Sequence, residues 1–165
     1  MSFFRVAKHL FIPDWWAHRV FPKSVLVRID AAVRESEKLH RGELRFVIEG
    51  DLDLSALLRG VTPRERAEEL FARMRVWDTA ENSGVLIYVQ LIDHGIEIVA
   101  DRGISAKVGQ AEWDVICTAM QSKFRAGEYE QGSVDAIKAI TAVLGQHFPV
   151  AGPNLDELPN QPVRL

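Results

Sequence analysis

The sequence predicts an α/β fold, a three-layer α/β/α sandwich around a small mixed sheet that includes an antiparallel hairpin. Segments with helical periodicity alternate with short apolar segments typical of buried strands, in the order α-β-α-β-β-α-α. A helical segment separates the first two strands, as in a right-handed crossover between parallel strands. Only a short polar turn separates the second strand from the third, so these two strands must be antiparallel.

The first half of the domain contains a helix, a strand and a second helix. Between about residues 24 and 40, apolar residues recur on one helical face, and Gly42 follows as a stop. Residues 44–48 are mostly apolar and β-friendly, which indicates a strand. The next helix begins at the capping-box sequence Thr62-Pro63-Arg64-Glu65 and extends to about residue 77.

The second half contains a hairpin followed by two helices. Residues 85–89 form a continuous apolar run, typical of a central strand that is covered on both faces. The turn Asp93-His94-Gly95 leads into a strand over residues 96–100. Two helices are predicted at about residues 107–126 and 129–147, each with an apolar stripe.

These segments define one domain over residues 25–149, flanked by a tail and an N-terminal segment of different character. The tail, residues 150–165, carries three prolines and no periodicity, so we expect it to be extended or disordered. Residues 1–24 are aromatic-rich and irregular. We expect this segment to pack on the domain or on a partner through Trp15, Trp16 and Phe21.

The alternative role for the N-terminal segment is contact with a membrane surface, with Arg5 and Lys8 as its basic component. Pro13 interrupts the amphipathic pattern after about three turns, and membrane docking through a helix needs a longer apolar face. We therefore favour packing on this domain or on a second copy of it.

Composition excludes several classes of protein. The 165 residues carry a net charge of −3 with both signs interspersed, which argues against a nucleic-acid surface. The single cysteine, Cys117, cannot form an internal disulfide, which fits a reducing compartment. No apolar run is long enough to span a membrane, and the N-terminus lacks the features of a secretory signal. We expect a cytoplasmic protein.

Three stretches of the chain, in this order, resemble the TPM-domain family. Residues 76–89, VWDTAENSGVLIYV, contain a helix end with an Asp, then Asn and Gly, then an apolar strand. Residues 93–103, DHGIEIVADRG, contain a polar turn, a strand and a Gly-containing loop. Residues 124–129, FRAGEY, lie between the two C-terminal helices. The resemblance covers about residues 25–149, and the chain differs in carrying Ser83 where Asn is common in the family.

The resemblance implies a Rossmann-like sandwich and a range of activities. Family members occur in bacteria, plastids and animals, and many are exported or membrane-anchored. Thylakoid members are linked to photosystem repair and are credited with acid phosphatase activity, and some members bind divalent cations. Because this chain shows neither a signal peptide nor a transmembrane helix, it resembles a short bacterial form.

The hairpin predicts an acidic corner at one end of the sheet. With its turn centred between Asp93 and His94, the antiparallel register brings Asp101 near Leu86 and close to the loop before that strand. We expect a Ca²⁺ or Mg²⁺ site there, because hard cations prefer carboxylate, amide and carbonyl oxygens. The expected ligands are Asp78, Glu81, Asn82 and Asp101. The alternative is structural, with Asp78 capping backbone amides, Asn82 in a left-handed turn and Asp101 paired with an Arg.

Two functions follow from this corner. The favoured one is a non-catalytic binding or assembly module, with a protein partner or a second copy of the chain, whose corner holds a cation. The alternative is a metal-assisted acid phosphatase of low efficiency. It would need a cationic group on the phosphate, for which Arg102 is the candidate, and no paired general acid and base is visible. The sequence Asp51-Leu52-Asp53-Leu54-Ser55 is similar to an aspartyl-phosphatase motif, but we interpret it as a solvated turn.

Overall fold

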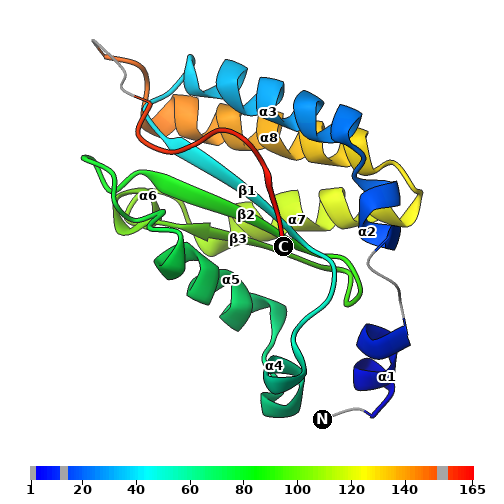
Figure 1. Cartoon of the computed structure of the whole chain (residues 1–165). Coiled ribbons are helices and arrows are strands. Elements are labelled where there is room, and N and C mark those ends of the chain that lie inside the picture. Colours follow the sequence, from blue (N-terminus) through cyan, green and yellow to red (C-terminus); the bar gives the residue numbers. More distant parts are fainter. Residues whose placement is uncertain (1–2, 12–14, 152–155) are drawn as a thin grey trace.

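A four-stranded sheet, with strands in the order β3-β2-β1-β4, organises the molecule (Figure 1). The computed structural model describes residues 3–11, 15–151 and 156–165. The strands are β1 (Glu43–Glu49), β2 (Gly84–Gln90), β3 (Gly95–Ala100) and β4 (Val163–Arg164). The predicted mixed α/β architecture is confirmed. β1 and β2 are parallel, with Glu43 opposite Gly84, and β2 and β3 are antiparallel.

Helices cover both faces of this sheet. One face packs against α3 (Lys23–Glu37), α7 (Gln110–Arg125) and α8 (Tyr129–His147), and the other packs against α5 (Pro63–Arg73). Side chains alternate along a strand, so β2 contributes Val85, Ile87 and Val89 to the first core and Leu86 and Tyr88 to the second. All seven residues of β2 are buried, as its continuous apolar run predicts.

The crossover from β1 to β2 contains two helices where the sequence predicted one. α4 (Leu54–Arg59) begins at Asp53, whose carboxylate accepts a hydrogen bond from the Ala56 amide at 2.9 Å. The predicted start of α5 is confirmed, because Thr62 and Glu65 form the reciprocal capping box. Asp53 therefore has a capping role in the segment that is similar to an aspartyl-phosphatase motif.

The N-terminal segment is helical, and the prediction that it is irregular was wrong. α1 (Phe3–Phe11) and α2 (Trp15–Val20) precede α3, while residues 1–2 and 12–14 lie outside the described part of the chain. Phe21 is fully buried in the main core and Trp16 packs at its edge, but Trp15 is 59% exposed. An isolated amphipathic helix of this length is marginal in water, so we attribute the order of α1 to its tertiary contacts.

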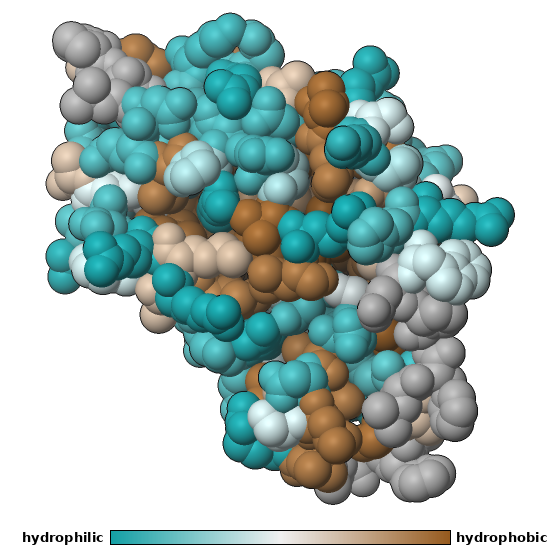
Figure 2. Space-filling model, viewed as in Figure 1, coloured by the Kyte–Doolittle hydropathy of each residue, from teal (hydrophilic) through white to brown (hydrophobic). Residues whose placement is uncertain are grey.

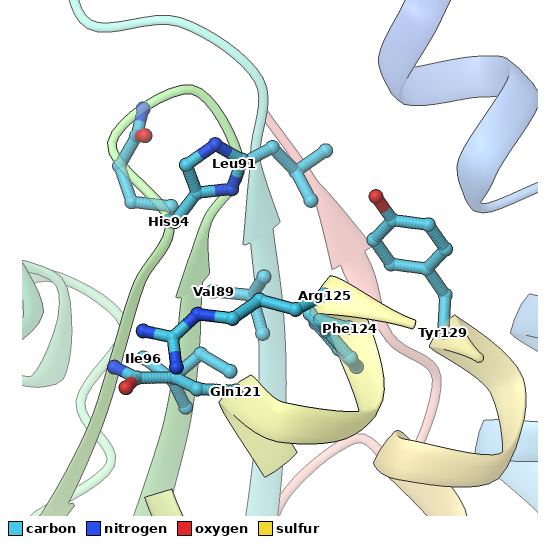
Figure 3. A pocket seen from close by; sticks show the side chains of 9 residues that line it. Val89, Leu91, His94, Ile96, Gln121, Phe124, Arg125 and Tyr129 are labelled. Atoms are coloured by element: carbon cyan, nitrogen blue, oxygen red, sulfur yellow. The ribbon is translucent and has the colours of Figure 1, made fainter. Parts of the chain in front are cut away.

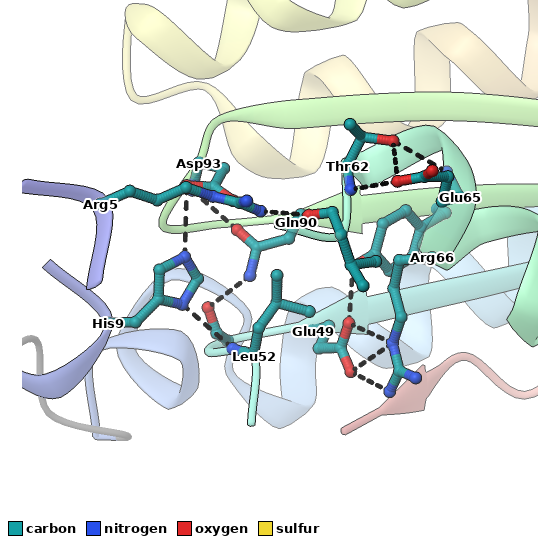
Figure 4. A network of polar contacts seen from close by, with 12 residues as sticks. Arg5, His9, Glu49, Leu52, Thr62, Glu65, Arg66, Gln90 and Asp93 are labelled. Atoms are coloured by element: carbon teal, nitrogen blue, oxygen red, sulfur yellow. Dashed lines mark hydrogen bonds and ion pairs between the residues drawn. The ribbon is translucent and has the colours of Figure 1, made fainter. Parts of the chain in front are cut away.

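Polar contacts hold α1 against the tip of the hairpin (Figure 4). Arg5 Nε donates to Asp93 Oδ2 at 2.8 Å and Arg5 Nη2 donates to the Val61 carbonyl at 2.7 Å. The Leu52 amide donates to His9 Nδ1 at 3.0 Å, while His9 Nε2 lies 3.2 Å from Asp93 Oδ1 without hydrogen-bond alignment. Burial would raise the pKa of Asp93, but the hydrogen bond and charge of Arg5, together with the neighbouring His9, outweigh it and hold this pKa below its usual value.

The tail returns along the sheet edge and ends as β4. Val163 and Arg164 pair in parallel with Val47 and Ile48 of β1, and Leu158 is buried in the α5-side core. Residues 152–155 of the tail lie outside the described residues. In the part of the chain that the structure describes, no helix has both the length and the hydrophobicity that crossing a membrane requires.

Apolar side chains gather at the lower end of one face, over α4 (Figure 2). Leu54 and Leu58, one helical turn apart on α4, are 51% and 56% exposed. Exposed apolar groups that cluster on one helix face are more informative than single ones, because clusters mark interaction surfaces.

Candidate cation site at the start of the parallel strands

The first residues of β1 and β2 and the last residue of β3 lie at the same end of the sheet. Glu43 is opposite Gly84, and Val85 is opposite Ala100. The hairpin register differs from the predicted one by two positions, because Leu91–His94 form the turn and Gly95 already pairs with Gln90. Asp101 therefore bonds through its amide to the Gly84 carbonyl at 2.9 Å rather than lying beside Leu86.

Asp101 is the most buried of the four predicted ligands, with 8% of its surface exposed. It is the N-cap of α6 (Arg102–Ser105), and its Oδ1 accepts from the Arg102 amide at 2.7 Å. Its other carboxylate oxygen, Oδ2, is buried and has no hydrogen-bond partner among the described residues. A buried carboxylate oxygen without a donor is costly, so this atom is available to a cation or an ordered water.

Asn82 lies beside Asp101, but its side chain is already hydrogen-bonded to an arginine. Its φ of 53° is left-handed, a conformation that Asn tolerates better than most residues. Asn82 Oδ1 accepts from Arg102 Nε at 2.8 Å, and its carbonyl accepts from the Gly103 amide at 3.1 Å. A Cβ at position 103 would come within 2.6 Å of the carbonyl oxygens of Glu81 and Asn82, so the close approach of the two loops requires Gly103.

The side chains of the remaining two predicted ligands, Glu81 and Asp78, form no hydrogen bond with Asn82 or Asp101. Glu81 forms an ion pair with Arg41. Asp78 is exposed, and its side chain forms no hydrogen bond or ion pair with another described residue. The corner therefore brings Asn82 and Asp101 together through Arg102, while Glu81 is paired elsewhere.

A second acidic group, which was not predicted from the sequence, lies at the same end of the sheet. Among the described residues, three carboxylates have ligand atoms within 4.8 Å of one another, close enough to share one ion. They are Glu37 at the end of α3, Glu43 at the start of β1 and Asp156 from the tail. The only signal in the sequence was an acidic residue on each side of the turn from α3 to β1.

Two of these carboxylates are buried and bonded to backbone amides. Glu37 Oε1 accepts from the Leu44 amide at 3.0 Å. Glu43 Oε2 accepts from the amides of Glu157 and Leu158 at 3.3 and 3.2 Å. Burial raises the pKa of Glu37 to about 8; the Leu44 amide opposes this rise and the neighbouring Glu43 adds to it. Burial also raises the pKa of Glu43.

Asn160 completes this cluster with an amide. It is 6% exposed, and it lines the same cavity, of about 330 Å³, as the three carboxylates. Its Nδ2 donates to Asp156 Oδ2 at 3.2 Å, whereas its Oδ1 is buried without a hydrogen-bond partner among the described residues. We call Glu37, Glu43, Asp156 and Asn160 the tail cluster.

Comparison with known proteins identifies the family of this chain and a solved structure that is similar to it. The family model described as "TPM domain" matches residues 18–143. The solved NMR structure of BA42 protein, from the psychrophilic bacterium Bizionia argentinensis sp. nov., is 31% identical to this chain. The two structures agree with a TM-score of 0.75, over 86% of this chain and 92% of BA42. No curated protein matches the chain.

Proposed function

This chain belongs to the TPM-domain family, and we propose that it is a non-catalytic binding module that holds Ca²⁺ or Mg²⁺ in the tail cluster. The observation that carries the proposal is the convergence of three carboxylates and one buried amide on a single cavity. Asp156 and Asn160 lie beyond the residues that match the family, so this site would be particular to chains with such a tail.

Electrostatics supports a cation at this place. Two carboxylates close together in a poorly solvated site cannot both ionise cheaply, because each negative charge opposes the other and burial opposes both. The raised pKa values of Glu37 and Glu43 express that cost. A divalent cation would remove it by supplying an opposite charge to both carboxylates, and it would also satisfy Asn160 Oδ1.

The donor set favours a hard cation. All four side chains offer oxygen, and the tail cluster includes no His or Cys. Ca²⁺ takes about 6–8 oxygen ligands in flexible geometry, and Mg²⁺ retains several waters, so a partly open cavity suits either ion. Zn²⁺ would be expected with nitrogen or sulfur ligands.

Thermal unfolding with added CaCl₂ or MgCl₂ tests the proposal. A cation at a hundredfold excess over its dissociation constant adds about 2.7 kcal/mol to the free energy of unfolding. For a domain of this size, each kcal/mol raises Tm by roughly 2–4 °C. We expect this rise to disappear in Asp156→Asn and Glu37→Gln. The matched control is Glu35→Gln, which lines the same cavity but pairs with Lys38 on the surface.

The same measurement at two pH values gives a further check. A carboxyl with a raised pKa carries its proton in the fold up to about pH 8, so a cation must displace that proton to bind. The rise in Tm should therefore be larger at about pH 8.5 than at about pH 6. Without a cation, the free energy of unfolding should fall as the pH rises from the usual pKa of a glutamate to about 8, because the folded protein holds the Glu37 proton more tightly than the unfolded chain does. Arg34, which also faces Glu37, favours its ionised form.

The predicted corner is the second position at which a cation would be tested. Asp101 Oδ2 lacks a partner, so Asp101→Asn separates the two positions. A rise in Tm that is lost in Asp101→Asn but kept in Asp156→Asn would assign the cation to Asp78, Glu81, Asn82 and Asp101 instead. Cations that leave the Tm of the wild-type protein unchanged would refute both assignments.

The phosphatase alternative receives less support from the same contacts. A phosphate at the corner would need a free cationic group, but the charge of Arg41 is paired with Glu81, and the side chain of Arg102 is held by its hydrogen bond to Asn82. We expect little or no hydrolysis of 4-nitrophenyl phosphate by the pure protein. Robust turnover that is lost in Asp101→Asn with the fold intact would replace the binding module with the phosphatase.

A further inference from the structure

A small pocket lies at the opposite end of the sheet from the tail cluster (Figure 3). It is formed by the carboxyl end of β2, the start of β3, and the turn between α7 and α8. In open α/β sheets, the carboxyl ends of the parallel strands are the usual place for ligands. Its enclosed volume is about 20 Å³, above the roughly 10–15 Å³ that one water needs by the same measure.

The floor of the pocket is apolar and firmly packed. Val89 and Ile96 come from the hairpin, and Phe124 comes from α7. Phe124 belongs to a ring cluster with Phe21 and Tyr129, in which the ring centroids lie 5.0–5.8 Å apart. A floor that is fixed in advance loses little freedom when a ligand binds.

Polar side chains surround this floor without bonding one another. Gln121, Arg125 and Tyr129 approach from the helices, and His94 approaches from the tip of the hairpin (Figure 3). None of these four side chains makes a hydrogen bond or ion pair with another described residue. The lining contains no Asp or Glu, although the chain as a whole has a net charge of −3. Arg125 is therefore an uncompensated cation at the mouth of an apolar pocket.

We propose that this pocket binds a small organic carboxylate, with its apolar body on the floor and its carboxylate paired with Arg125. The guanidinium is planar, and its parallel N–H groups match a carboxylate in size and direction. The Gln121 amide, which lies beside the Arg125 guanidinium in Figure 3, would supply an additional donor. The small volume admits little more than one methyl group, so a branched carboxylate would insert one methyl and keep its carboxylate outside, at the exposed Arg125. This proposal is independent of the cation, which would lie at the other end of the sheet.

Backbone-amide NMR titration of the full chain tests the proposal with three probes. Sodium isobutyrate has a branched apolar body and a carboxylate. Isobutyramide has the same shape without charge, and inorganic phosphate has charge without the apolar body. We expect saturable shifts at residues 89–96 and 121–129 with isobutyrate, and at least about tenfold weaker binding of the other two, since a charge-assisted pair and apolar burial each contribute that much.

Matched variants connect the binding to the named side chains. Arg125→Gln should weaken isobutyrate at least about tenfold, because it removes the charge from an exposed position without disturbing the core. Arg73→Gln, on the exposed surface of α5, is the control and should leave the affinity unchanged. Equal affinities for isobutyrate and isobutyramide, no saturable shifts, or unchanged binding in Arg125→Gln would each overturn the proposal.

Discussion

At the scale of single residues, the buried carboxylate of Glu49 shows how a charge can be stabilised by complete pairing. Arg66 Nη2 lies 2.6 Å from Glu49 Oε1, and the Tyr88 hydroxyl donates to Oε2 at 2.5 Å (Figure 4). Burial and the adjacent Glu49 charge raise the pKa of Tyr88, and the hydrogen bonds that Arg66 donates to Glu49 raise the pKa of Arg66. These contacts fasten α5 to the ends of β1 and β2.

Glu49→Gln should strongly destabilise the protein, because it leaves the Arg66 charge buried without its main partner. Breaking a buried pair from one side costs roughly 3–5 kcal/mol of unfolding free energy. The control is Glu69→Gln, since Glu69 pairs with the same Arg66 but is half exposed, and surface pairs contribute about 0–1 kcal/mol. Urea unfolding measures both. Equal losses in the two variants would show that burial does not set the strength of this network.

The tail cluster and the predicted corner differ in how many of their neighbouring residues could be predicted from the sequence. Asp101 and Asn82 were predicted to be neighbours because a hairpin fixes which residues meet, and they do lie together at Gly103. Neither Glu37 nor Glu43 could be paired with Asp156 in advance, because a tail without periodicity gives no indication of where it packs. The arginines that pair with Glu81 and Asn82 were likewise not predictable from spacing.

At the scale of elements, local chemistry predicted beginnings and order better than it predicted registers. Thr62 and Glu65 fixed the start of α5 through a local capping box, which needs no tertiary information. The turn of the hairpin was misplaced because Gly95 was assigned to the turn, whereas it is the first residue of β3. The Asp93 amide donates to Gln90 Oε1 at 2.7 Å, and this side-chain bond, which periodicity does not reveal, closes the turn earlier.

The N-terminal segment was misjudged for a related reason. Its two short helices have weak intrinsic stability, and their contacts with the hairpin tip, with α4 and with the core come from distant parts of the sequence. Aromatic composition predicted burial correctly for Phe21, which is fully enclosed, but it did not distinguish Phe21 from the exposed Trp15.

Two truncations measure separately how much α1 and Phe21 contribute to the stability of the protein. Removal of residues 1–14 deletes α1 and its bonds to Asp93, and should reduce the unfolding free energy by a few kcal/mol at most, since those bonds are partly exposed. Removal of residues 1–22 also deletes Phe21. That should cost about 3–5 kcal/mol more, as for loss of a buried Phe, and Phe21→Ala in the full chain should reproduce most of the difference.

Chemical unfolding and sedimentation of the three proteins check this prediction. If the 1–22 truncation is as stable as the full chain and has the same oligomeric state in solution, the segment has no structural role. A truncation that is stable but changes from dimer to monomer would instead place the segment in an interface, next to the exposed Leu54 and Leu58 of α4.

At the scale of the whole molecule, the tail joins the sheet edge to the candidate cation site. β4 covers the outer edge of β1, Leu158 fills the core under α5, and the Arg45 guanidinium donates to the Pro159 carbonyl and to the Gln161 carbonyl at 3.1 Å. The part of the tail that makes these contacts, residues 156–165, also supplies Asp156 and Asn160 to the tail cluster. The cation and the tail should therefore stabilise each other, because whatever binds only the docked tail also favours docking.

Truncation after residue 150 tests this coupling. It removes Asp156, Asn160 and β4, so we expect the protein to lose its rise in Tm with Ca²⁺ or Mg²⁺ and to unfold at a lower temperature even without a cation. Burial of Leu158 alone contributes roughly 1.5–3 kcal/mol, and the uncovered edge of β1 should make the shortened protein prone to self-association. The full-length double variant Asp156→Asn/Asn160→Ala is the control, because it removes two ligands but keeps β4 and Leu158. It should lose the response to cations while keeping most of its cation-free stability. A truncated protein that still gains as much Tm from the cation as the full chain would show that the tail does not contribute to the site.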